Sequence, residues 1–142
     1  MNSSNNVIPV LNRLLTTLYR ALPVYIQGAH PWVPPERRPA MDLLHRIAGD
    51  QQMYAQRVAH AILQEGGRTE IGQFPLEYAA LHDLGIDYLL KKAAEAQRRQ
   101  VQIVEECVSA LNGVPRLHSL AEEVLGNARG HLESLEDTMN DE

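Results

Sequence analysis

The sequence predicts an all-α protein: one four-helix bundle over residues 1–142, with a long crossover between its second and third helices. Apolar residues recur at steps of three and four along four long stretches, which is the pattern of helices that bury one face. No stretch alternates apolar and polar residues for long enough to predict a strand. The length of 142 residues, with 44% hydrophobic and 22% charged residues, suits a single globular domain.

The first helix is expected over about residues 8–28 and the second over about 39–64, with a proline-rich loop between them. Pro23 lies inside the first stretch and predicts a kink, because proline lacks an N–H and its ring clashes with the preceding turn. Gly66 and Gly67 are expected to end the second helix. The expected core stripe of the first helix is Leu11, Leu14, Leu18, Leu22 and Tyr25.

The third helix is expected over about residues 84–111 and the fourth over about 116–137. Only a short turn around Asn112 and Gly113 separates them, so these two helices must be antiparallel neighbours. The segment between the second and third helices is long enough to run the length of the bundle. That length predicts the crossover and argues against a simple up-and-down bundle.

Charge and cysteine content exclude several classes of function. A formal net charge of −5 argues against nucleic-acid binding, which requires clustered positive charge. The single cysteine, Cys107, excludes a disulfide framework and any site that needs several cysteines. Neither an export signal nor a membrane-spanning stretch is visible, so we expect a cytoplasmic protein with no membrane partner.

Polar residues interrupt the apolar stripes near the middle of three helices. Gln51 and Tyr54 fall on the inward face of the second helix, Gln97 on that of the third and His131 on that of the fourth. An unpartnered buried polar group costs about 1–3 kcal/mol, so these side chains are expected to contact one another or water. They form either a hydrogen-bond network that sets the helix register, or a ligand or metal site in the bundle centre.

Asp50 and Asn127 flank this predicted polar layer, and the helical phase places both off the buried stripe. A third reading is that the phase itself is wrong and some of the four layer residues face solvent.

Two segments carry a resemblance to a known superfamily. DQQMYAQRVAHAILQEGG (50–67) resembles the second helix, and NARGHLESLED (127–137) the fourth helix, of ferritin-like proteins such as bacterioferritin and rubrerythrin. The order and spacing of all four expected helices agree with that superfamily. The resemblance implies the ferritin-like fold. It also implies that the superfamily's di-iron site is the position to inspect, a site built from one Glu on each of two helices and a Glu-x-x-His on each of the other two.

The resemblance places those ligands at positions where this chain mostly has other residues. The glutamate of the first helix falls on Leu18 and that of the third on Gln97. The two Glu-x-x-His pairs fall on Gln51 and Tyr54, and on Ala128 and His131, so only His131 matches. Iron ions in a dry core need carboxylates for neutralisation, and amides or aliphatic groups replace them poorly.

The resemblance therefore implies a degenerate di-iron site, with no catalytic residues and no cofactor assigned. The function it favours is a non-catalytic interaction or small-ligand-binding module. The alternative is an iron- or other metal-binding protein, or a di-metal oxidoreductase, with an altered ligand set built on His131.

The first helix also carries a second apolar line, formed by Ile8, Leu15, Tyr19 and Ile26. Left in water, this line would be an apolar patch of the kind that monomers rarely expose. It predicts a homodimer through helices one and two, with Leu15, Tyr19 and Ile26 as the dimer face, and ferritin-like relatives often pair in this way. The alternative is that Trp32, in the loop after this helix, covers the line.

Overall fold

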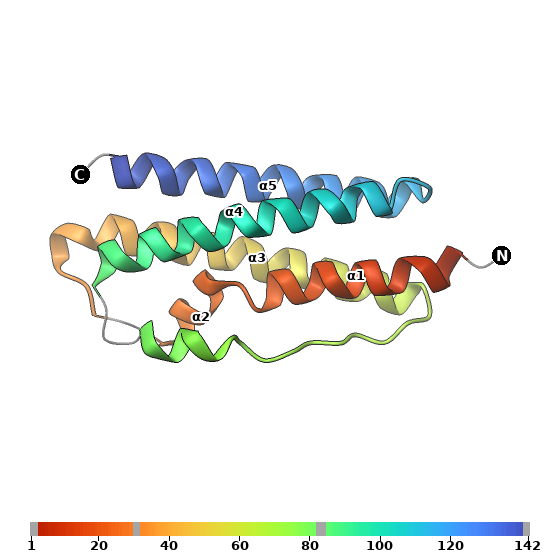
Figure 1. Cartoon of the computed structure of the whole chain (residues 1–142), viewed down its shortest axis with the longest axis horizontal. Helices are drawn as coiled ribbons and strands as arrows, with labels where there is room; N and C mark the ends of the chain where they lie inside the picture. Colours follow the sequence, from red (N-terminus) through yellow and green to blue (C-terminus); the bar gives the residue numbers. More distant parts are fainter. Residues whose placement is uncertain (1–2, 30–31, 82–84, 141–142) are drawn as a thin grey trace.

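The computed structural model describes residues 3–29, 32–81 and 85–140, and within these residues the chain contains helices and no strands. The long helices are α1 (Ser3–Tyr19), α3 (Arg38–Gln64), α4 (Ile86–Ala110) and α5 (Pro115–Asn140). The short elements are α2 (Leu22–Ala29) and two 3-10 helices at Pro35–Arg37 and Leu76–Leu81. The long helices run alongside one another as a bundle (Figure 1), and the predicted all-α fold class is confirmed.

The first helix differs from its prediction, because it is broken rather than kinked. It begins at Ser3, upstream of the expected start, and the chain leaves the helix at Arg20 and Ala21 before α2 starts. Pro23 lies in the first turn of α2, where a missing N–H costs nothing because that turn has no intrahelical acceptor for it. The break therefore falls just before the proline, in the turn that its ring would otherwise crowd.

The other helices follow the expected ranges closely. α3 ends as predicted at the two glycines: Gly66 has a φ of 80°, and the Gly67 N–H donates to the Ile62 carbonyl at 2.9 Å. α4 and α5 differ from their predicted ends by one to three residues, apart from the expected start of the third helix at Leu84, which lies outside the described residues. No helix in the described part of the chain is both long and apolar enough to cross a membrane.

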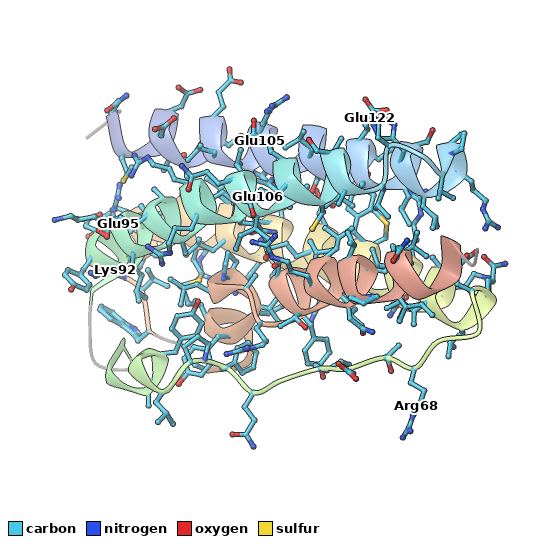
Figure 2. The ribbon with its side chains drawn as sticks, turned by 45° about the vertical axis from the view of Figure 1, so that its right-hand side comes forward. Arg68, Lys92, Glu95, Glu105, Glu106 and Glu122 are labelled. Carbon is cyan, nitrogen blue, oxygen red and sulfur yellow. The ribbon has the colours of Figure 1, made fainter. Side chains whose placement is uncertain are left out.

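The crossover between α3 and α4 runs along α1 and α2 in an extended form (Figure 1). Asn12 holds it with two hydrogen bonds, donating from Nδ2 to the Arg68 carbonyl at 2.9 Å and accepting at Oδ1 from the Glu70 N–H at 2.7 Å. Thr16 Oγ1 also donates to the Glu70 carbonyl, at 3.1 Å. The Arg68 side chain points away from the bundle (Figure 2). The predicted crossover is thus confirmed, and α1 fixes its path.

Two apolar clusters fill the core, one toward each end of the bundle, with polar residues between them. On α3, Ile47 belongs to one cluster and Ala55 to the other, and Gln51 lies between them. On α4, Ala94 and Val104 belong to different clusters in the same way. The predicted interruption of the core by a polar layer is therefore present in the structure.

The expected dimer face is corrected at two of its three residues. Leu15 and Ile26 are only 1% and 2% exposed, each inside one of the core clusters. α1 packs against both α3 and α4, so its buried arc is wider than a single stripe. Ile8, on the same apolar line, lies against Gly67 of the crossover, whereas Trp32 is 81% exposed.

Self-association through the surface around Tyr19 stays a prediction. Tyr19 is 46% exposed and borders a surface cavity of about 770 Å³ with the exposed Ile71. Light scattering at tens of micromolar should give about twice the chain mass of 15.9 kDa, and Tyr19→Glu should return it to one chain. Tyr88→Glu, at a comparably exposed tyrosine on α4, is the control. A single-chain mass that Tyr19→Glu leaves unchanged would contradict the dimer.

Candidate functional site

Three buried glutamines form a hydrogen-bonded group between the two apolar clusters, and we call Gln51, Gln97 and Gln100 the glutamine layer. Gln51 Nε2 donates to Gln100 Oε1 at 3.1 Å and lies 3.4 Å from Gln97 Oε1. Gln97 Nε2 donates to the backbone carbonyl of Ala128 at 3.0 Å. The layer thus links α3, α4 and α5 in the middle of the bundle.

The backbone of α5 fixes the orientation of these amides. The Ala128 carbonyl can only accept, so Gln97 must present its NH2 to α5 and its oxygen to Gln51. Gln51 then donates, and its own Oε1 is left buried without a hydrogen-bond partner among the described residues. A buried acceptor without a donor costs about 1–3 kcal/mol, so the layer has one unmet acceptor that a water or ligand donor can satisfy.

Gln100 is the member of the layer that the sequence analysis missed. It is 6% exposed and lies one turn after Gln97, on the same side of α4. The predicted stripe passed from Gln97 to Val101, but α4 packs against α1, α3 and α5 and buries a wider arc than one stripe. The signal available in the sequence was the spacing Gln97-x-x-Gln100, which places both amides on one face.

Tyr54 does not join the glutamine layer, although it is partly buried and packs against one apolar cluster of the core, on the inward side predicted for it. Its hydroxyl lies 3.5 Å from Glu123 Oε2 at the surface between α3 and α5, and the Arg57 guanidinium lies 5.3 Å from its ring centroid. Partial burial, followed by the negative charge of Glu123, raises the Tyr54 pKa above its usual value. The tyrosine therefore belongs to a solvent-facing ion-pair group with Arg57 and Glu123.

His131 lies on the inner side of α5, but its partner is Asp50. Its Nε2 is 3.1 Å from Asp50 Oδ2, without the alignment of a hydrogen bond, and Asn127 Nδ2 donates to the same carboxylate oxygen at 3.1 Å. Asp50 is half exposed, in keeping with its predicted position off the buried stripe, and its side chain still reaches His131. Burial lowers the His131 pKa, and the Asp50 carboxylate offsets part of that effect.

This lowered pKa predicts a loss of stability in mild acid. The unfolded chain binds the His131 proton more strongly than the folded chain, so the free energy of unfolding should decrease as the pH falls below about 6.5. Above that pH the contribution is constant. Urea unfolding at pH 7.5 and 5.5 should show a smaller difference in His131→Asn than in the wild type. His60→Asn, at an exposed histidine of α3, should keep the wild-type difference, and equal pH slopes in all three proteins would contradict the prediction.

The residues at the expected di-iron position do not fit such a centre. Leu18 and Ala128 are each 2% exposed, and neither has a side chain that can bind a metal. Gln51 and Gln97 use their amides within the glutamine layer. Across residues 3–29, 32–81 and 85–140, no three His, Cys, Asp or Glu side chains gather closely enough to hold a metal ion. His131 and Asp50 form a pair without a third ligand.

A cavity of about 550 Å³ opens beside the glutamine layer, at the break between α1 and α2. Most of its accessible lining surface is apolar, and we call it the polar cavity after the polar and charged side chains among its lining residues. Its walls come from α1, the first residues of α2, the crossover and α4, and Gln97 and Gln100 contribute to its lining. The other polar and charged residues around it are Asn12, Arg13, Thr16, Thr17, Arg20, Glu70 and Arg99. The layer is therefore in contact with a space that a small molecule can enter.

Comparisons with known proteins agree with this architecture. No protein-family model matches the chain, and no curated protein matches it in sequence. Among solved structures it is similar to a chain from Bacillus anthracis str. Ames, described among "ferritin like, diiron-carboxylate proteins". The TM-score is 0.81 at 17% identity, over 98% of this chain and 99% of the other. The likeness lies in the fold alone, and it confirms the ferritin-like four-helix fold expected from the sequence.

Proposed function

We propose that this protein is a non-catalytic ferritin-like binding protein, which holds a small polar molecule in the polar cavity against the glutamine layer. The observation that carries the proposal is the shared position of Gln97 and Gln100. Both residues belong to the buried hydrogen-bonded layer, and both line the cavity. A ligand in the cavity is thus held at the level where the core itself is polar.

The chemistry of the glutamine layer supports binding rather than catalysis. Primary amides both donate and accept hydrogen bonds, but they neither bridge metal ions nor transfer protons near neutral pH. Ligand sites in helix bundles commonly lie between helices and occupy about 300–1,000 Å³, a range that includes this cavity. The break before α2 supplies the opening, because it interrupts the wall that a continuous first helix would form.

The proposal is tested by measuring melting temperatures with a set of small neutral, anionic and cationic polar molecules. At least one class should raise the melting temperature of the wild type through binding to the folded state. Thr16→Phe, which fills part of the cavity, should remove that effect. Ser109→Phe, at an exposed position of α4, should retain it. No stabilisation by any class, or equal stabilisation of wild type and Thr16→Phe, would contradict the proposal.

A metal-binding function is the second candidate, and it rests on His131. Its Nε2 has no hydrogen-bond partner among the described residues and lies beside the Asp50 carboxylate, so the two side chains offer two ligands to a divalent ion. Metal analysis of protein purified without chelators decides between the candidates. Stoichiometric iron, zinc or manganese that disappears in His131→Ala would favour this one, whereas metal-free protein would leave the cavity as the candidate site.

A further inference from the structure

We infer that the ligand of the polar cavity is a small organic anion, which places a carboxylate or phosphate group against Arg20 and Arg99. This inference rests on the proposed function and names the class of molecule that the same cavity takes. Three observations carry it. They are the excess of positive charge in the lining, the buried Nε of Arg20 that has no hydrogen-bond partner among the described residues, and the amide of Gln100 in the lining.

Positive charge gathers around the cavity, although the chain as a whole carries a net charge of −5. Its lining contains three arginines, Arg13, Arg20 and Arg99, and one acidic residue, Glu70. Arg13 is neutralised by Glu106 of α4 at 2.7 Å, and Figure 2 labels that glutamate on the α4 ribbon above α1. Among the described residues, Arg20 and Arg99 form no ion pair. With Glu70 as the one carboxylate in the lining, positive charge exceeds negative charge around the cavity.

Arg20 is held in place but incompletely satisfied. Its Nε is buried and has no hydrogen-bond partner among the described residues. Its side chain lies against Gly72 of the crossover, with Nη1 3.1 Å from the position that a Cβ of Gly72 would take. A guanidinium offers five N–H donors in a planar fork that matches a carboxylate or phosphate. An anion in the cavity would supply the acceptors that Arg20 lacks.

The backbone adds a smaller contribution of the same sign. Ala21, which precedes α2, and Leu22 and Pro23, its first two residues, line the cavity. The start of a helix carries partial positive charge, which favours an anion nearby. Pro23 has no N–H and the Ala21 N–H donates to the Leu18 carbonyl at 3.4 Å, so this contribution comes from the helix dipole rather than from a set of free donors.

Gln100, in the lining of the cavity, favours a second acceptor on the ligand. Gln100 uses its Oε1 to accept from Gln51, and its NH2 donates to no group of the described residues. A ligand with an anionic end at Arg20 and Arg99 and a carbonyl or carboxylate oxygen at Gln100 satisfies both. Short dicarboxylates and small phosphate esters have this arrangement of groups.

Titration calorimetry of the full chain at low salt tests the inference with matched probes. Glutarate supplies two carboxylates, glycerol 3-phosphate supplies a phosphate ester, and glutaramide is the uncharged analogue of glutarate. At least one of the two anions should bind at least about tenfold more tightly than glutaramide, since hydrogen bonds to charged groups are the stronger ones. The affinity should also fall as the salt concentration rises.

Three arginine variants locate the site. Arg20→Gln and Arg99→Gln should each weaken anion binding by about tenfold or more. Arg68→Gln removes the same charge from a crossover residue that points to solvent (Figure 2), and its affinity should stay within about twofold of the wild type. Retained melting temperatures in Arg20→Gln and Arg99→Gln show that the loss is one of binding.

The outcomes separate this inference from the proposed function. Tighter binding of glutarate than of glycerol 3-phosphate, or the reverse, supports the inference and identifies the anionic group. Glutaramide binding that equals anion binding and that Thr16→Phe removes would overturn the inference and keep the proposed function. The absence of binding by every probe, or anion binding that Arg20→Gln and Arg99→Gln both leave unchanged, would overturn the anion site itself.

Discussion

Leu18→Glu is expected to lower the free energy of unfolding by about 4 kcal/mol or more. Leu18 is 2% exposed inside an apolar cluster, at the position where the ferritin-like resemblance implies a metal-binding glutamate. The substitution removes a well-packed side chain and buries a carboxylate that has no cation beside it. The carboxyl pKa would then rise in the folded state, so the loss should be smallest below about pH 4.3 and grow as the pH increases.

The same variant tests whether the core keeps any capacity for iron. Urea unfolding is measured at pH 5 and 7.5, with and without ferrous iron or zinc. We expect neither metal to restore the lost stability, because one new carboxylate beside amides and Ala128 does not complete a ligand set. Leu18→Gln is the control that separates the effect of the buried charge from that of the changed side-chain shape. Leu63→Glu, at an exposed position of α3, is the surface control, and its free energy of unfolding should stay within about 0.5 kcal/mol of the wild type. Recovery of Leu18→Glu by either metal would show that the bundle centre still binds metal.

The architecture was predictable from the sequence because the signals for it are local and long. Each long helix repeats the 3.6-residue period over many turns, and the Gly66-Gly67 stop and the Asn112-Gly113 turn mark helix ends directly. Gln51 and Gln97 interrupt apolar stripes that are otherwise regular, so their burial followed from phase alone. The length of the segment after Gly66 was sufficient to predict the crossover.

The wrong predictions of exposure share one physical cause. The apolar pattern of a single helix shows where its buried face is centred, but it does not show how many neighbouring helices cover that face or how wide it is. α1 contacts two neighbouring helices, which buries Leu15 and Ile26 in addition to the predicted stripe. The same effect on α4 buries Gln100. Tyr54 shows the opposite case, because a long amphipathic side chain at the edge of a stripe can direct its hydroxyl to a charged partner at the surface.

The polar cavity could not be predicted from any one segment. It requires the interruption of α1 before Pro23, the attachment of the crossover by Asn12 and the approach of α4, and these contacts join residues far apart in the sequence. Arg20 and Arg99 have no periodic relation to each other in the sequence, and both line the cavity only in the folded bundle.

The second large effect is expected from single and double substitutions in the glutamine layer. Gln97→Leu should lower the free energy of unfolding by about 1–3 kcal/mol, because it removes the hydrogen bond that Gln97 adds to the Ala128 carbonyl and one acceptor of Gln51. Gln51→Leu should cost about 1–3 kcal/mol, because it removes the donor on which the oxygens of Gln97 and Gln100 depend.

The double variant Gln51→Leu/Gln97→Leu should be more stable than the sum of the single losses predicts, by about 1–3 kcal/mol. Leucine has nearly the volume of glutamine, so the double substitution joins the two apolar clusters and also removes the unmet acceptor at Gln51 Oε1. Urea unfolding of the wild type, both single variants and the double variant gives this coupling energy. Ala59→Leu, at a half-buried position of α3 away from the layer, combined with Gln97→Leu should show additive losses. If the double variant is close to wild-type stability and no longer binds the cavity ligand, the glutamines serve binding rather than folding. Strictly additive losses of stability would contradict the coupling within the layer.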